Sequence, residues 1–364
     1  MSRLTNNSQK TKVESRKTLS SLGVSGLLTL NVVVLLLAGC APRVATSFWK
    51  IGTPADSVKE GYKVIYAEGK TRHCYPITEW VSTDEKEDVY HSLHHHGVAV
   101  ESELMAYRIY FDKKQTIDPY CKRTPQLELA QSHWYPNDSL LAAGYGDDIL
   151  RVSGTVGVGS VKYWNGKKQV HIEPVAERSQ RIVASQEEQA AVEIAVKGWQ
   201  VPTAKRSYSD SGQCIDLHVR YTMKAGHRDM RCDVVCSEPI EGLCTGVQTI
   251  PAKGGKDTVS IILPNGVLLA SWGTDWPVND SAKYAKETVG LGVFIPKEFA
   301  GEIVHDKQNN LCLLNSQITN HKSQRCATAH FYLTCCGATK ENHPVARNAE
   351  EWTAYLKKWV KGLK

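Results

Sequence analysis

Apolar and polar positions alternate along short stretches through most of the chain, and each such stretch predicts a β-strand. Successive side chains of a strand point to opposite faces of its sheet, so a strand with one buried face alternates apolar and polar residues. We predict strands at residues 107–111, 149–161, 169–173, 191–196, 217–222 and 260–263. Glycine-containing pairs that favour tight turns stand between them, at 165–166, 225–226, 254–255 and 265–266.

A helical pattern is clear only at the end of the chain. Residues 349–363 place Trp352, Tyr355 or Leu356, Trp359 and Leu363 three or four positions apart, which is the spacing of one helix face. Many short strands with one terminal helix predict a mostly β protein. We therefore expect residues 61–364 to form a single domain, a large antiparallel β-sandwich or a barrel-like fold, that ends in the helix 349–363.

The first 39 residues have the pattern of a secretory signal. Basic residues precede an uncharged run over residues 19–38, which ends on Ala38, Gly39 and Cys40. Small residues before a cysteine are typical of a bacterial lipoprotein leader. We predict cleavage before Cys40, lipidation of Cys40 and a tether over residues 40–60. Residue 41 is Ala rather than Asp, which favours the outer membrane. The alternative is an uncleaved membrane anchor, although polar residues interrupt the run.

Charge and cysteine content narrow the class of protein. The formal charge of +6 falls to +2 after residue 39, because 39 basic and 37 acidic side chains remain. Such a near-neutral surface argues against a nucleic-acid partner. Ten cysteines follow Cys40; an exported protein can form disulfides from them, but a chain of this length does not need them. We expect several buried thiols and predict no particular pairing.

The absence of several known catalytic motifs disfavours the corresponding classes of enzyme. The sequence has no Gly-x-Ser-x-Gly, Walker or His-Glu-x-x-His motif, which disfavours a serine hydrolase, a nucleotide enzyme and a zinc protease. A histidine run at residues 94–96 is the densest group of reactive side chains. For His94 and His95 we favour an exposed loop, whereas a catalytic role and a structural role are equally open for His96.

Two glutamates, a tyrosine and an arginine follow the histidines. If residues 101–111 form one strand, Glu101, Glu103 and Tyr107 share one face and Arg108 lies on the other. Carboxylates and a phenol near an imidazole suit acid–base chemistry on a sugar, and Arg108 suits a carboxylate. The alternative is that the glutamates are solvated.

Further candidates lie on two predicted strands and a glycine-rich turn. His171 and Glu173 share one face of their predicted strand, so they are either an acid–base pair or ordinary cross-strand partners. Asp147 and Asp148 stand side by side and could contribute to a Ca²⁺ site, although a turn explains them as well. Arg220 is a candidate for binding a uronate, or it simply faces water.

The loop at residues 270–280 is a candidate sugar site. Trp272 and Trp276 could stack on a pyranose ring, while Asp275 and Asn279 could bind its hydroxyl groups. The alternative is that the tryptophans anchor the core.

The segments 94–118, 143–150 and 272–277 together resemble a family of lipoproteins from Bacteroides relatives, filed as domain of unknown function 4861 (DUF4861). The most specific part is Glu-x-Glu-x-x-x-Tyr-Arg-x-Tyr over residues 101–110, followed by Ile117 and Asp118. The resemblance covers about residues 60–300. Such proteins accompany polysaccharide-degradation systems, so the resemblance implies a sandwich like those of galactose mutarotases and several polysaccharide lyases. It also implies a carbohydrate ligand, but it names no reaction.

The leading hypothesis is therefore an enzyme that acts on a uronic-acid-containing glycan. A lyase would use Tyr107 or His96 as base, Arg108 to neutralise the uronate, and Glu103 or His171 as proton partner.

Three alternatives remain open. A hydrolase would pair Glu101 or Glu103 with Asp275. A non-catalytic surface glycan-binding lipoprotein would present Trp272 and Trp276 as a platform. A mutarotase-like epimerase would use a histidine and a carboxylate.

Overall fold

The computed structural model describes residues 43–52, 63–67, 70–132, 135–202, 214–251, 257–321 and 324–363, all of which belong to one compact unit, Cys40–Lys364. The predicted signal, Cys40 and part of the tether lie outside the described residues. Within the described part of the chain, no helix has both the length and the hydrophobicity to cross a bilayer.

The protein is mostly β, as predicted, and its largest sheet has ten strands. Nine of them follow the order β17-β18-β19-β23-β15-β14-β13-β12-β5, and β22 pairs with β23. All the pairings are antiparallel. The bounds are β5 Glu79–Ser82, β12 Glu177–Ser185, β13 Gln189–Gln200, β14 Cys214–Lys224, β15 Met230–Cys236, β17 Asp257–Leu263, β18 Gly266–Asp275, β19 Glu287–Pro296, β22 Gln317–His321 and β23 Gln324–Gly337.

Two five-stranded sheets and one three-stranded sheet complete the unit. The first has the order β1-β6-β7-β8-β9 (Val44–Ser47, Gly97–Ser102, Met105–Tyr110, Ile117–Cys121, Asp147–Asp148). The second has the order β11-β10-β16-β21-β20 (Gln169–Val170, Lys162–Trp164, Leu243–Gln248, Asn309–Leu314, Ala300–His305). The third is β2-β4-β3 (Trp49–Ile51, Lys70–Pro76, Lys63–Ala67).

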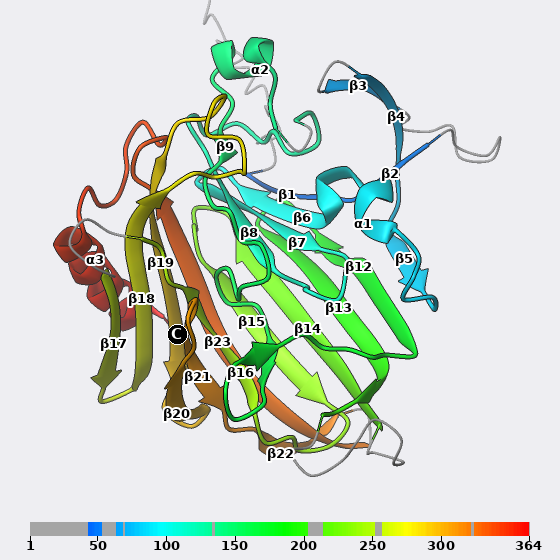
Figure 1. The fold of residues 1–364 in the computed structure, drawn as a ribbon, viewed down its shortest axis with the longest axis vertical. Helices are drawn as coiled ribbons and strands as arrows, with labels where there is room; N and C mark the ends of the chain where they lie inside the picture. Colours follow the sequence, from blue (N-terminus) through cyan, green and yellow to red (C-terminus); the bar gives the residue numbers. More distant parts are fainter. Residues whose placement is uncertain are drawn as a thin grey trace, which may run out of the picture. The chain divides into compact units, whose positions relative to one another are not determined.

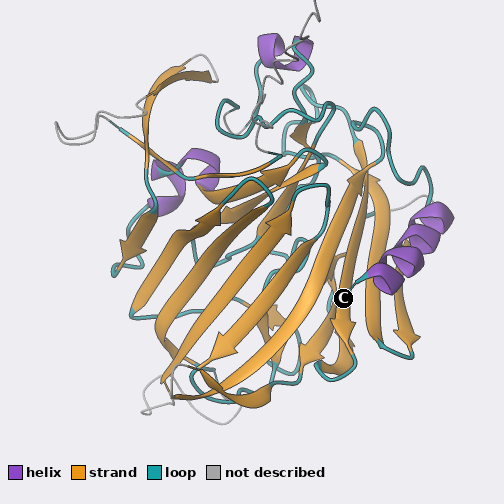
Figure 2. Cartoon of the chain, turned by 180° about the vertical axis from the view of Figure 1, so that it is seen from behind, coloured by secondary structure: helices purple, strands orange, loops and turns teal. Residues whose placement is uncertain are grey.

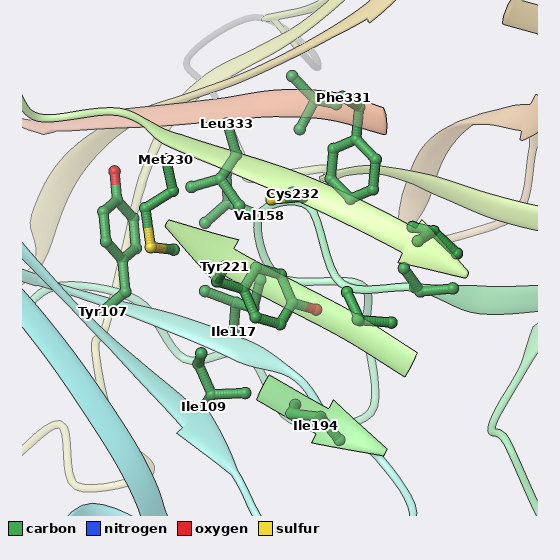
Figure 3. Close-up of a cluster of buried hydrophobic side chains, with 14 of the residues drawn as sticks. Tyr107, Ile109, Ile117, Val158, Ile194, Tyr221, Met230, Cys232, Phe331 and Leu333 are labelled. Atoms are coloured by element: carbon green, nitrogen blue, oxygen red, sulfur yellow. The ribbon is translucent and has the colours of Figure 1, made fainter. Parts of the chain in front are cut away.

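The hydrophobic core lies between the ten-stranded sheet and the two five-stranded sheets. In Figure 1, β6, β7 and β8 cross in front of the large sheet, where β6 contacts β13 and β14 and β8 contacts β23. On β14, alternate residues from Ile215 to Met223 point into the core, which is the predicted period of two. Figure 3 shows Tyr107 of β7 beside Met230 of the large sheet, and Ile109 of β7 near Ile194 and Tyr221 in the same buried cluster.

Residues 101–111 form parts of two strands rather than one. β6 ends at Ser102, and Glu103 and Leu104 make the turn into β7. The assumption of a single strand was wrong. Every residue of both strands is buried, and Glu103 and Leu104 are not residue types that favour a turn. As a consequence Glu101 and Arg108 share the outer face, and Tyr107 points the other way into the core.

The predicted strand at 149–161 is also wrong, since this stretch is an irregular segment with isolated bridges at Gly157 and Val158. Gly157 has φ +55°, and an added Cβ would lie 2.2 Å from the carbonyl oxygen of Ile117. The glycines here provide a backbone conformation that other residues rarely adopt. Likewise, the predicted strand at 169–173 ends at Val170.

Three α-helices accompany the sheets in the described chain: α1 (Val89–Ser92), α2 (Asp138–Ala142) and α3 (Ala349–Gly362). The predicted terminal helix is confirmed as α3, whose first turn is capped by the side chain of Asn348. Figure 2 shows α3 lying against the large sheet. Trp352 and Leu356 fill the space over Gly290 and Gly292, where a Cβ would clash.

Candidate functional site

Four polar side chains meet on the outer face of the first five-stranded sheet. Nη2 of Arg108 on β7 lies 2.7 Å from Oδ2 of Asp118 on β8 and 2.7 Å from Oδ2 of Asp148 on β9. The hydroxyl of Tyr110 also donates to Asp118. All four side chains are buried, so the network is held in a region of low dielectric constant.

Two carboxylates share one guanidinium in this network. Burial raises the pKa of both Asp118 and Asp148, although Arg108 opposes the rise. One buried cation compensates one buried carboxylate well but not two. The network therefore favours a state in which one of the two aspartates keeps a proton.

Aromatic rings connect this network to its surroundings on two sides. His96 stacks on Tyr90 with centroids 3.8 Å apart, and Tyr90 makes an edge contact with Tyr110 at 5.2 Å. On the other side, Tyr135 lies beside Asp148, and its ring is 5.6 Å from that of Tyr284 in the loop after β18. The structure thus brings together two predicted site residues, His96 and Arg108, through Tyr90 and Tyr110.

A polar cleft of about 580 Å³ lies beside the loop that follows β18. Arg151, three residues after Asp148, donates to Oδ1 of Asn279 at 2.7 Å and to Oδ2 of Asp275 at 3.2 Å. These are two of the predicted sugar-binding residues. The described lining residues are Arg151, Ser153, Thr155, Gln248, Thr249, Pro251, Asp275, Asn279, Lys307 and Gln308.

Hydrogen bonds hold the cleft wall in place. The hydroxyl of Thr155 donates to Oε1 of Gln248 at 2.6 Å, and the side-chain nitrogen Nε2 of Gln248 donates to the backbone carbonyl of Arg151 at 3.0 Å. The amide of Trp276 donates to Oδ1 of Asp275 at 2.9 Å. The side chains of Arg151, Asp275 and Gln248 therefore sit in fixed positions before any ligand arrives.

Several predicted site residues lie elsewhere. Tyr107 is fully buried in the core, where its hydroxyl donates to the carbonyl of Arg228 at 2.6 Å. Glu103, at the β6–β7 turn, pairs with Arg43 and accepts from the amide of Gly226. Glu101 is buried and pairs with Lys122. Tyr107 and Glu103 therefore do not share a cleft with the histidine run and the tryptophans.

Trp272 packs into the apolar cluster beneath α3, with its ring 6.5 Å from that of Trp352. It therefore acts as a core anchor, the alternative given above. Trp276 is half-buried, and Lys286 lies over its ring at 4.1 Å. Arg220 lies on the outer face of the large sheet, where it donates to Glu193 at 3.1 Å.

The histidines also differ from expectation. His94 and His95 are buried rather than exposed, and the carbonyl of Leu129 accepts a hydrogen bond from His95 at 2.6 Å. His171 is half-buried, and burial with nearby Lys162 lowers its pKa to about 4. It is therefore neutral at pH 7. Glu173, its predicted partner, pairs with Lys113 at 3.3 Å.

The two adjacent aspartates bind cationic side chains rather than converging on one point. Asp148 pairs with Arg108, and Asp147 pairs with Lys340 at 3.0 Å. Across the described residues, no group of three or more histidines, cysteines or acids could hold a metal ion. Arg151 was missed because it belongs to the stretch interpreted as a strand, and no local pattern marks a residue whose partners lie 124 and 128 positions away.

Comparison with known proteins gives a family but no activity. No curated protein matches the sequence. Among solved structures, a glycosyl hydrolase family 38 protein from Enterococcus faecalis is similar with a TM-score of 0.38 and 10% identity, over 88% of this chain and 41% of that one. The chain thus spans less than half the length of that protein. The profile of a family described as "Domain of unknown function (DUF4861)" matches residues 55–364. As the resemblance in its motifs indicated, the chain belongs to the DUF4861 family.

Proposed function

We propose that this protein is an exported, lipid-anchored protein that binds an acidic saccharide in the Arg151 cleft. The observation that carries the proposal is the composition of the lining, in which every described residue except Pro251 carries a hydroxyl, amide or charged group. A pyranose presents hydroxyl groups on all sides and needs such donors and acceptors when it leaves water. The volume of about 580 Å³ lies within the range of small-molecule sites.

The charge of the lining favours an acidic sugar. Arg151 and Lys307 are opposed by the carboxylate of Asp275, which leaves the described lining with one net positive charge. A ligand carboxylate can share Arg151 with Asp275, because a guanidinium offers five donors.

Binding is better supported than cleavage at this cleft. Hydrolysis requires two carboxyl groups on either side of the scissile bond, and Asp275 is the single carboxylate among the described lining residues. The predicted lyase needs a tyrosine or histidine base and the predicted epimerase needs a histidine beside its carboxylate, and the described lining contains no histidine or tyrosine. Lyase and hydrolase activity on a uronic-acid glycan remain the finer predictions from the sequence. Their candidate residues are Asp275 in the cleft, and His96 and Arg108, which Tyr90 and Tyr110 connect.

Isothermal titration calorimetry tests the proposal with oligogalacturonates, mannuronate oligosaccharides and neutral cello-oligosaccharides. We expect an acidic ligand to bind wild-type protein, and Arg151→Met to weaken it about tenfold or more, since hydrogen bonds to charged groups are strong. Arg231→Met is the matched control: Arg231 pairs with Asp233 at 2.7 Å and its side chain is 43% exposed, against 40% for Arg151. Equal loss in both variants, or tighter binding of the neutral sugars, would contradict the proposal.

The lipid anchor requires a separate test, because Cys40 lies outside the described residues. We expect the mature protein to begin at Cys40 and to carry diacylglycerol there, as shown by mass spectrometry of its N-terminal peptide. Cys40→Ser should abolish the modification. A mature chain that begins elsewhere would exclude the anchor and leave the cleft proposal intact.

A further inference from the structure

A second cavity of about 580 Å³ lies on the other flank of the first five-stranded sheet. Its walls are residues 82–91, which include α1, the β7–β8 turn at 111–114, and residues 173–178 before and in β12. It shares no described lining residue with the Arg151 cleft. Tyr90, whose ring stacks on that of His96, is part of its wall.

Arg178 lies in the wall of this cavity and is only 6% exposed. It stands near the start of β12, between Ser82 of β5 and Val196 of β13, so flanking strands bury its side chain. Nη2 donates to the carbonyl of Ile172 at 2.8 Å. Nη1 is buried and has no hydrogen-bond partner among the described residues. A buried donor of a charged group without a partner is costly, and native structures rarely keep one without a reason.

The acids nearest to Arg178 already have other donors. Asp112 accepts from the amide of Lys114 at 2.8 Å and pairs with its ammonium at 3.1 Å. Glu173 pairs with Lys113 at 3.3 Å. Glu85 accepts from the amide of Val175 at 2.8 Å. These carboxylates act on Arg178 through space, but none of them forms a hydrogen bond to Nη1.

From this geometry we infer that the cavity is a binding site for a ligand carboxylate, which accepts a hydrogen bond from the Arg178 guanidinium once its side chain shifts and brings the covered Nη1 to the cavity wall. Arg is suited to this task because its planar guanidinium holds a carboxylate in a fixed orientation. Lys113 and Lys114 stand in the same wall, where their ion pairs with Glu173 and Asp112 are partly exposed. Such pairs are weak and can rearrange when a ligand enters.

The rim of the cavity restricts which carboxylates fit. Asp84, Glu85, Glu87 and Asp88 are exposed and line the entrance. With Asp112 and Glu173 they give the described lining six carboxylates against four cationic side chains. Every negative group of a ligand beyond the one that Arg178 binds therefore adds repulsion. The site therefore selects a molecule that carries one carboxylate on an otherwise neutral body. That carboxylate can belong to a small free acid or to a sugar acid, and the inference does not rest on the saccharide proposal for the other cleft.

Arginine side-chain NMR tests this on the folded wild-type protein. Protein labelled with ¹⁵N-arginine is titrated with acetate, D-glucuronate, the neutral methyl ester of D-glucuronate, and citrate. We expect the Arg178 guanidinium signals, assigned with Arg178→Lys, to shift with acetate or glucuronate and to stay unchanged with the ester. A response to glucuronate alone would assign the site to a sugar acid, and an equal response to acetate would assign it to small acids. Citrate should bind more weakly than either.

Variants complete the test. Arg178→Lys should weaken the responding acid about 10- to 100-fold, the range expected for loss of a charged hydrogen bond. Lys113→Ala, at an exposed position, should weaken it a few-fold in a protein whose folding is unaffected. Arg231→Met should leave the affinity unchanged. The inference is overturned if the Arg178 signals do not respond to either monocarboxylate, or if the methyl ester binds as tightly as the acid.

Discussion

The substitution Asp275→Asn separates binding from cleavage at the Arg151 cleft. Oδ2 of Asp275 lies 3.2 Å from Nη2 of Arg151, and the two side chains are 24% and 40% exposed. Asparagine keeps the oxygen that accepts from the amide of Trp276 but removes the negative charge. Arg151 then loses its protein carboxylate and becomes more available to a ligand carboxylate.

The size of the effect follows from the exposure of the pair. Partly exposed ion pairs contribute about 0.2–1 kcal/mol, so we expect acidic oligosaccharides to bind about 1.5- to 5-fold more tightly to Asp275→Asn. Neutral oligosaccharides should be unaffected, and the gain should shrink as salt is added. Calorimetry on both proteins at two salt concentrations measures this. If Asp275 instead served as a catalytic acid or nucleophile, the variant would lose product formation. Weaker binding of the acidic ligand to Asp275→Asn than to wild-type protein would refute the reasoning.

Three further predictions concern the scaffold. Arg108→Met leaves Asp118 and Asp148 buried without their cation, so the free energy of unfolding in urea should fall by about 3–5 kcal/mol; a fall below about 1 kcal/mol would show that the network is not a buried ion pair. Burial alone would raise the pKa of Glu193, but hydrogen bonds from His218, Arg181 and Arg220 lower it to about 2. The stabilisation from Glu193 is therefore complete above its ordinary pKa of 4.5 and is lost as the pH falls towards 2; Glu193→Gln should flatten the acid limb of the unfolding curve, and an unchanged limb would count against these bonds. Trp352→Ala should cost about 3–5 kcal/mol and release α3 from the sheet, seen as lost near-ultraviolet dichroism, whereas an unchanged spectrum would contradict this packing.

Regular one-sided burial explains which parts of the fold were predictable. β14 has one face in the core and one in contact with solvent, so its sequence alternates and its prediction is confirmed. Trp352 and Leu356 of α3 face the sheet while lysines face solvent, which gives a clear helical period. β6 and β7 are buried on both faces and are joined by Glu103 and Leu104, which are not typical turn residues, so the sequence does not reveal where β6 ends.

The candidate site was only partly predictable for a related reason. Asp275 ends β18 and Asn279 lies four residues later in the loop that follows, so the sequence could place them together. Arg151 joins them across more than 120 residues, through a contact that only the folded sheets create. Arg178 could not be recognised either, because its importance lies in burial and in a donor without a partner. Tyr107 and Trp272 were interpreted as functional because aromatic residues serve both the core and sugar sites.

The most direct test of the central claim is a crystal structure of the protein with a bound acidic oligosaccharide. The account predicts a sugar in the cleft beside the β18–β19 loop, with its carboxylate within hydrogen-bonding distance of Arg151 and its hydroxyl groups on Gln248 and Asn279. A sugar bound over the exposed face of the large sheet, with the Arg151–Asp275 pair unchanged and the cleft empty, would contradict it.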